Sequence, residues 1–169
     1  MRVIIEGPNN VGKSTIIKEL KKLQWFENSN VEYFGMNTPK TLNFYNDILN
    51  DYDDVICDRF MISELVYSEY YKRDSKITID DVIKTLNNKK DVIMIFVDAQ
   101  YEFIVNSYKN KQEEFDYDLV RYERLKFDEY RKLIDSKCQE CKMIHIVNSV
   151  GDSVPIAHII NKIILQRRW

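Results

Sequence analysis

Two of the four glycines in this 169-residue chain stand close together near its start, Gly7 and Gly12, and Lys13 and Ser14 directly follow the second. Glycine is needed where the backbone must adopt conformations or close approaches that a side chain forbids. The apolar run Val3 to Ile5 precedes this turn, and a helical pattern of apolar residues follows it. The start of the chain is therefore constrained to a strand that passes through a tight turn into a helix.

The turn fits the pattern G-x-x-x-x-G-K-[ST]. In this pattern successive backbone N–H groups, aided by the positive end of the helix, cradle phosphates, the lysine reaches the β- and γ-phosphates, and the hydroxyl ligates Mg²⁺. We therefore expect Lys13 to act in catalysis, Ser14 to bind Mg²⁺, and the whole loop to bind a nucleoside triphosphate. The residues expected to bind this nucleotide, ATP if the resemblance described below holds, are Gly7, Pro8, Asn9, Asn10, Val11, Gly12, Lys13, Ser14 and Thr15.

Along the rest of the chain, short apolar runs rich in β-branched residues alternate with helical patterns. The expected strands are 3–5, 31–34, 55–57, 91–97 and 143–147. Helices are expected near 16–23, 42–49 and 61–72, from 78 and from about 100. A polar stretch near 109–114 should end that last helix, and a long helix to about 136 and a closing helix over 154–165 should follow. Thr78 and Asp81 have the spacing of a helix-capping pair. This alternation predicts an α/β fold with a five-stranded parallel sheet flanked by helices on both faces, in one domain over residues 1–169.

Composition narrows the classes of partner. The net charge is −2, so no general basic field favours a nucleic-acid polymer. No apolar run reaches the roughly 20 residues of a membrane span, and the start of the chain has no signal-peptide pattern. An odd number of cysteines, three, does not suggest a disulfide framework. We expect a cytoplasmic protein, and the abundance of Asn, Lys, Ile and Tyr is compatible with a viral or phage origin.

A second informative stretch ends the apolar run Val55 to Cys57 with Asp58 and Arg59. An acid at the end of a buried strand is where enzymes with such a phosphate loop hold Mg²⁺ or activate a nucleophile. The planar guanidinium beside it suits a phosphate or a carboxylate. We therefore expect Asp58 to serve the metal and catalysis, and Arg59 to act on a phosphate.

Together, "IIEGPNNVGKST" and "DRFMISELVY" resemble the thymidylate kinases and the related deoxynucleoside kinases. The resemblance implies a P-loop kinase fold with a short lid, Mg·ATP as phosphoryl donor and a (deoxy)nucleoside monophosphate as acceptor. It also implies that Arg59 holds the acceptor phosphate and that Tyr67 shapes the sugar pocket. The residues expected to contact the acceptor are Glu32, Phe34, Phe44, Tyr45, Arg59, Phe60, Ser63 and Tyr67. Core packing is the competing interpretation of Phe44 and Tyr45.

The resemblance places the lid at about residues 107–116. Two arginines usually approach the transferred group there, whereas this chain has Ser107 and Lys111 at those positions and Lys109 between them. We expect Lys109 and Lys111 to stabilise charge on the moving phosphoryl group.

Departures from the family pattern keep alternatives open. The Arg-Glu-Pro segment is absent, and Ser68 stands in place of a glutamine, so thymine specificity does not follow. A deoxynucleoside kinase is the close alternative, with Asp58 or Glu32 as the base that a free hydroxyl requires. A P-loop switch that controls a protein partner is the more distant one. Homodimers are common in the family, so the resemblance also allows a second copy of this chain as a partner.

Overall fold

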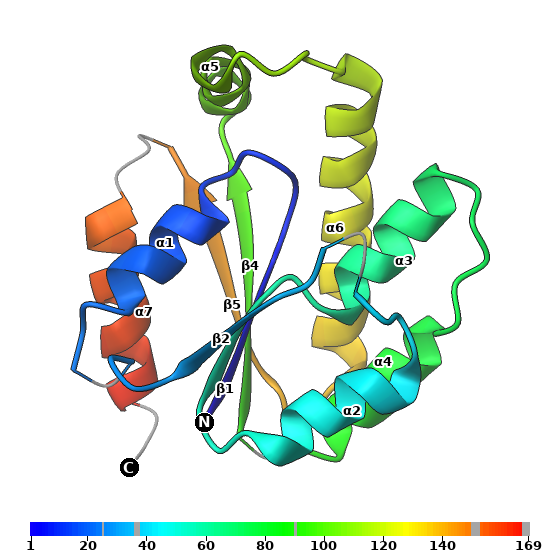
Figure 1. The fold of residues 1–169 in the computed structure, drawn as a ribbon, viewed down its shortest axis with the longest axis vertical. Helices are drawn as coiled ribbons and strands as arrows, with labels where there is room; N and C mark the ends of the chain where they lie inside the picture. The colour runs from blue at the N-terminus through cyan, green and yellow to red at the C-terminus, as the bar shows by residue number, and fades with distance from the viewer. Residues whose placement is uncertain (25, 36–37, 90, 150–152, 167–169) are drawn as a thin grey trace.

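Five parallel strands form one sheet in the order β2-β3-β1-β4-β5. The computed structural model describes residues 1–24, 26–35, 38–89, 91–149 and 153–166 (Figure 1). The strands are β1 Arg2–Glu6, β2 Asn30–Tyr33, β3 Val55–Asp58, β4 Val92–Ala99 and β5 Lys142–Asn148. The helices are α1 Lys13–Leu20, α2 Leu42–Asp51, α3 Met61–Tyr70, α4 Ile79–Asn87, α5 Tyr101–Lys111, α6 Tyr117–Lys137 and α7 Ser153–Gln166. The expected five-stranded parallel sheet is confirmed.

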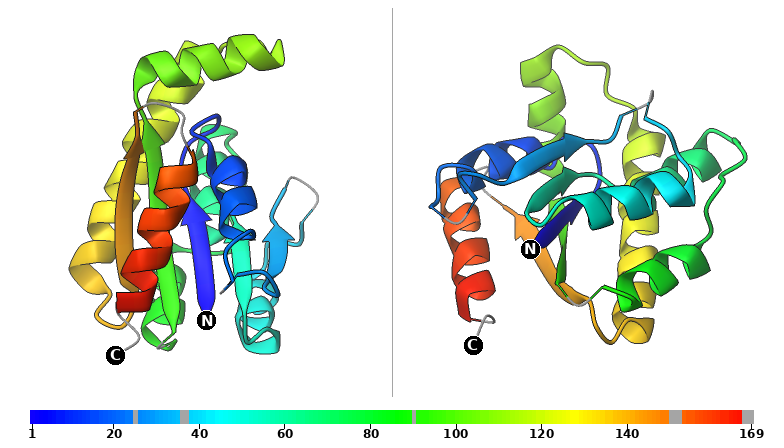
Figure 2. Two further views of the ribbon diagram at one scale, coloured as in Figure 1. Left: turned by 90° about the vertical axis from the view of Figure 1, so that its left-hand side faces the viewer. Right: turned by 60° about the horizontal axis from the view of Figure 1, so that its bottom comes forward.

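Helices cover both faces of the sheet, as Figures 1 and 2 show. Side chains of α2, α3, α4 and α6 pack on one face, and those of α1 and α7 on the other. Central strand β1 supplies both layers, because Ile4 belongs to the first cluster while Val3 and Ile5 belong to the second. This alternation follows from the two-residue period of a strand, and it explains why β1 reads as an unbroken apolar run.

The expected helix-capping pair is present at the start of α4. The Thr78 hydroxyl accepts a hydrogen bond from the Asp81 N–H at 3.2 Å, and the Asp81 carboxylate accepts one from the Thr78 N–H at 2.8 Å. One expectation needs correction. The polar stretch predicted to begin near Lys109 still belongs to α5, which extends to Lys111 and ends at Gln112 with a positive φ of 55°.

The strand order places a crevice at the carboxyl ends of the central strands. β1 lies between β3 and β4, and the chain passes from one side of β1 to the other between those two strands. In register, Ile5 pairs with Asp58 of β3, and Glu6 pairs with Phe96 of β4. Ligands of open parallel sheets bind at such a reversal of strand order. The loop after β1 and the turn after β3 therefore meet at the edge expected to carry the site.

Candidate active site

The phosphate loop connects β1 to α1 and turns through two glycines with positive φ, 143° at Gly7 and 92° at Gly12. A Cβ on Gly7 would lie 2.0 Å from the carbonyl oxygen of Val97 in β4. A Cβ on Gly12 would lie 2.9 Å from the side-chain nitrogen of Asn148 in β5. Both positions therefore exclude a side chain, and the loop is held against the ends of two strands.

Lys13 begins α1, and its buried side chain folds back over the loop. Its ammonium donates to the carbonyl oxygen of Gly7 at 2.9 Å and to that of Pro8. Burial, together with the positive charge of Arg59, lowers the pKa of Lys13 to about 7. Because a phosphate would bring negative charge to this ammonium, it would favour the protonated form. A bound phosphate could therefore replace the carbonyl oxygens of Gly7 and Pro8 as the hydrogen-bond acceptor of the Lys13 ammonium.

Ser14 and Asp58 meet across the crevice. The Ser14 hydroxyl donates to Asp58 Oδ2 at 2.6 Å. A hydroxyl and a carboxylate are the oxygen ligands that Mg²⁺ uses in nucleotide sites, where water and phosphate oxygens complete its shell. No cluster of three or more His, Cys, Asp or Glu side chains that could hold a metal occurs among the described residues. The pair fits a magnesium ion that is held jointly with a bound phosphate.

Arg59 follows β3 with a φ of 72°, a conformation uncommon outside glycine. One of its terminal nitrogens donates to the hydroxyls of Tyr67 at 2.9 Å and Ser63 at 3.3 Å, and the other donates to the side-chain oxygen of Asn9. The guanidinium also lies over the Tyr67 ring, 5.0 Å from its centroid. Its position is therefore fixed from both α3 and the phosphate loop.

Glu6, at the end of β1, helps to position α3 relative to the phosphate loop. The sequence analysis did not single it out. Its carboxylate is fully buried and accepts hydrogen bonds from the N–H groups of Ile62 at 3.0 Å and Ser63 at 3.1 Å, and from the Ser63 hydroxyl. Burial raises the pKa of Glu6. An acid at the start of a helix satisfies N–H groups that have no partner within the helix. Glu6 thus ties α3 to the phosphate loop, and its signal was an acid ending an apolar strand.

Glu123 of α6 is a second buried carboxylate that the sequence analysis missed. It accepts hydrogen bonds from the Asn9 N–H at 2.8 Å and from the Asn9 side-chain amide at 2.5 Å. It also hydrogen-bonds the Tyr67 side chain, and burial raises the pKa of Glu123. Glu123 therefore fixes both Asn9 and Tyr67, which are partners of Arg59. No local pattern in a helix with so many charges marks this position.

Two cavities adjoin at Arg59. The first, of about 520 Å³, contains the phosphate loop and will be called the phosphate cavity. The second, of about 560 Å³, lies over α3 and will be called the aromatic cavity. Both are lined by Asn9, Phe34, Gly35 and Arg59. Two chambers joined at one arginine can hold two ligands with their phosphates facing each other.

The phosphate cavity contains most of the predicted loop residues. It is lined by Asn9, Asn10, Gly12, Lys13, Ser14 and Thr15, and by Asp58. Gly7, Pro8 and Val11 do not line it. The carbonyls of Gly7 and Pro8 accept from Lys13, and Val11 is buried in the core while its carbonyl accepts from Asn148 at 3.1 Å.

The two predicted lid lysines differ in position. Lys111 lines the phosphate cavity, as does Ser107, and its ammonium donates to the Asn10 side-chain oxygen. Lys109 is exposed and does not line either cavity. The two residues stand two positions apart on one helix, so they point in different directions. Figure 1 shows α5 beyond the carboxyl ends of the strands, above the phosphate loop.

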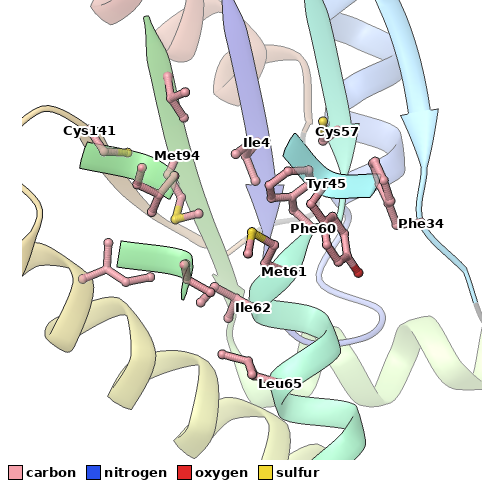
Figure 3. Packing of buried hydrophobic residues seen from close by; sticks show 14 of the residues in the cluster. Ile4, Phe34, Tyr45, Cys57, Phe60, Met61, Ile62, Leu65, Met94 and Cys141 are labelled. Carbon is pink, nitrogen blue, oxygen red and sulfur yellow. The ribbon is translucent and has the colours of Figure 1, made fainter. Parts of the chain in front are cut away.

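The aromatic cavity contains six of the predicted acceptor residues, Phe34, Tyr45, Arg59, Phe60, Ser63 and Tyr67. Phe34, Tyr45 and Phe60 form a buried cluster, with ring centroids 4.8 Å apart for Tyr45 and Phe60 and 5.5 Å apart for Phe34 and Phe60 (Figure 3). Lining residues that the sequence analysis missed are Gly35, Lys40, Glu64, Tyr71 and Arg73.

Two predicted acceptor residues lie outside the cavity. Phe44 packs edge-on against Phe34, at 6.0 Å between ring centroids. It therefore contacts a residue that lines the aromatic cavity without lining the cavity itself. Glu32 lines neither cavity, and its carboxylate instead hydrogen-bonds the Tyr52 side chain, which raises the pKa of Tyr52. The structure therefore does not bring Glu32 to the other predicted site residues.

No family model matches the chain. Over an alignment of 105 residues that covers 57% of this chain, the sequence is 34% identical to the SPbeta prophage-derived uncharacterized protein YorR of Bacillus subtilis strain 168. The match spans 61% of the length of that relative.

Solved structures resemble the whole chain. The YorR protein of Bacillus subtilis, in complex with phosphorylated GDP, superposes with a TM-score of 0.71 at 21% identity, covering 100% of this chain and 99% of that one. Shikimate kinase from Acinetobacter baumannii in complex with shikimate gives 0.58 at 12% identity, covering 98% and 93% of the two chains. Deoxyadenosine kinase from M. mycoides with bound dATP gives 0.56 at 17%, covering 96% and 99%. The chain has the fold of P-loop kinases.

None of the helices in the described part of the chain has both the length and the apolar character that crossing a membrane requires.

Proposed function

We propose that this protein transfers the terminal phosphoryl group of ATP to a (deoxy)nucleoside monophosphate and releases the diphosphate. The observation that carries the proposal is the pair of cavities that meet at Arg59. One is lined by a phosphate loop and candidate magnesium ligands, and the other by aromatic side chains with an arginine at the junction. Phosphoryl transfer needs this arrangement, because catalysis consists mainly of holding two phosphates together and neutralising their charge.

Each residue at the junction has a role that follows from its position. Lys13 and Lys111 would bind the phosphates of ATP, and Arg59 would bind the phosphate of the acceptor. Ser14 and Asp58 would hold Mg²⁺, which when bound neutralises charge on the transferred group. Phe34, Tyr45 and Phe60 give part of the aromatic cavity an apolar lining against which a planar base could pack.

The chemistry of the acceptor favours a monophosphate over a free nucleoside. A nucleoside hydroxyl needs a general base within hydrogen-bond reach, whereas a phosphate oxygen is already ionised. Glu32 lines neither cavity. Asp58, the remaining candidate for that base, accepts from Ser14 and is assigned to the metal. The complex of YorR with phosphorylated GDP adds support for a nucleotide ligand.

A phosphotransferase is also favoured over a nucleotide switch. A switch requires one nucleotide cavity, and the second, aromatic cavity would then have no ligand. A prophage-derived relative supports a phage origin, and we infer that such a protein serves nucleotide synthesis in the cytoplasm of the host cell.

The test is a panel assay. The purified protein is incubated with Mg·ATP and each common nucleoside or nucleoside monophosphate, and the release of ADP is followed. We expect multiple turnovers with one or two monophosphates and none with free nucleosides. Turnover only with nucleosides would replace this proposal with the nucleoside kinase. If ATP binds but no acceptor in the panel causes ADP release, both the monophosphate kinase and the nucleoside kinase are rejected.

A further inference from the structure

A buried carboxylate in the wall of the aromatic cavity has no role in the mechanism above. Glu64 of α3 is only 4% exposed and lines the cavity. Its Oε2 pairs with the ammonium of Lys40 at 2.9 Å and with the guanidinium of Arg73 at 3.4 Å. Both cations line the same cavity. Only Glu64 is buried, because the side chains of Lys40 and Arg73 are 22% and 41% exposed. A buried carboxylate is costly even when it is paired, so this pairing is weak evidence for stability and calls for another explanation.

This triad is distinct from the group around Arg59. The two groups share no hydrogen-bond or ion-pair partner within the described residues. Arg59 also lines the phosphate cavity, whereas Glu64 lines only the aromatic one. An acceptor with its phosphate on Arg59 would extend its base into the aromatic cavity, whose lining includes Glu64. The triad thus lies where the edge of a base would be recognised.

The triad offers a specific pattern of hydrogen-bonding groups. Both cations contact Oε2, and no hydrogen bond to Oε1 is found in the described part of the chain. An ionised carboxylate only accepts hydrogen bonds, whereas lysine and arginine only donate them. The wall of the cavity therefore presents acceptor positions flanked by two cationic donors.

Guanine is the base that matches this pattern. Its N1–H and N2 amino group are neighbouring donors on one edge, and O6 beside them is an acceptor. Cytosine and adenine place a ring-nitrogen acceptor next to their amino group, and that lone pair would face the carboxylate. Thymine has one N–H between two carbonyl oxygens, and the lone pairs of these oxygens would also face the carboxylate. We propose that Glu64 selects guanine as the acceptor base, with Lys40 and Arg73 holding the carboxylate and donating to O6.

This assignment rests on the proposed function, since it takes the aromatic cavity to be the acceptor site. The experiment compares kcat/KM for GMP, dGMP, AMP, dAMP, CMP, dCMP, UMP and dTMP with Mg·ATP. The proteins are the wild type, Glu64→Gln and the control Glu69→Gln, an exposed position of the same helix outside both cavities. Binding of GMP alone is measured by calorimetry on the same proteins.

We expect the wild type to prefer GMP or dGMP. Glu64→Gln should lose about 10- to 100-fold of the guanine kcat/KM, the range of one bidentate contact to a base. Its loss with AMP should be smaller, because an amide presents both a donor and an acceptor. Glu69→Gln should retain the wild-type order of bases.

The outcomes separate this proposal from the one on which it rests. A wild type that prefers another base overturns the guanine assignment and leaves the kinase in place. Glu64→Gln with unchanged guanine preference also overturns it. GMP binding that depends on Glu64, without turnover of any monophosphate, retains the assignment and rejects the kinase. The wild-type panel decides the question of the base even if Glu64→Gln does not fold.

Discussion

The two cavities are built in different ways, although they share Arg59. The phosphate cavity is lined by six residues of one contiguous segment, the loop from Asn9 to Thr15, together with the ends of β2 and β3 and with α5. The aromatic cavity draws on the ends of β2 and β3, on α2 and α3, and on the segments that follow them. A contiguous loop is specified by local backbone geometry, whereas a wall of scattered side chains depends on the packing of whole elements. The first kind of site tolerates little change, and the second can alter its ligand by single substitutions.

The largest effect is expected from Lys13→Met. Loss of a cation that faces the developing charge should lower kcat about 100- to 1,000-fold for every acceptor, the range for removing one such donor. The ratio of rates between acceptors should stay the same, because Lys13 lines only the phosphate cavity. Steady-state kinetics with two acceptors measures both quantities. A variant with a changed order of acceptors would contradict the division between the two cavities.

Arg59→Ala should act at the junction and affect one substrate more than the other. We expect KM for the acceptor to rise about 10- to 100-fold, the value of a hydrogen bond to a charged group, with a smaller change in KM for ATP. Initial rates with each substrate varied in turn provide the measurement. If KM for the acceptor stays at the wild-type value, Arg59 does not hold the acceptor phosphate.

The two lid lysines form a matched pair on one helix. Lys111→Ala should lower kcat about two- to fivefold, because an exposed charge contributes at most about 1 kcal/mol. Lys109→Ala should leave kcat unchanged, since Lys109 is exposed and lines neither cavity. Equal losses in the two variants would mean that α5 moves to a different position during the reaction.

The smallest signal is a proton taken up when ATP binds. Burial lowers the pKa of Lys13 to about 7 from 10.5, so the side chain is largely neutral at pH 8. Phosphate charge raises this pKa, and binding at pH 8 should therefore take up a proton, whereas binding at pH 6 should not. Calorimetry in buffers of different ionisation enthalpy measures the uptake, and Lys13→Met is the control. Equal uptake in wild type and variant would assign the proton to another group.

The same shift has a consequence for stability without ligand. Because the folded pKa of Lys13 lies below its unfolded value of 10.5, the unfolded chain binds more protons between about pH 7 and 10.5. The contribution of Lys13 to the free energy of unfolding should therefore rise with pH across that window. Lys13→Met should lack this rise.

The elements of the fold could be read from the sequence because each has a local signal. Unbroken apolar runs identify buried parallel strands, and the pair Thr78 and Asp81 identifies the start of α4. The phosphate loop could be predicted equally well, since its glycines are required by the backbone conformation of a few neighbouring residues. The end of α5 was less so, because Lys109 to Lys111 are polar in either conformation.

What the sequence alone determined was the strand-loop-helix unit that binds phosphate and the alternating order that gives a parallel sheet. Only the tertiary structure decided which acids belong to the site. Glu123 reaches Asn9 across 114 positions of the chain, whereas Glu32, closer in sequence, faces Tyr52 instead. Glu64 lies beside residues of the predicted motif, yet its role depends on Lys40 and Arg73, which approach it from two other segments. A side chain's partners are fixed by packing over long sequence separations, and local sequence patterns do not specify these partners.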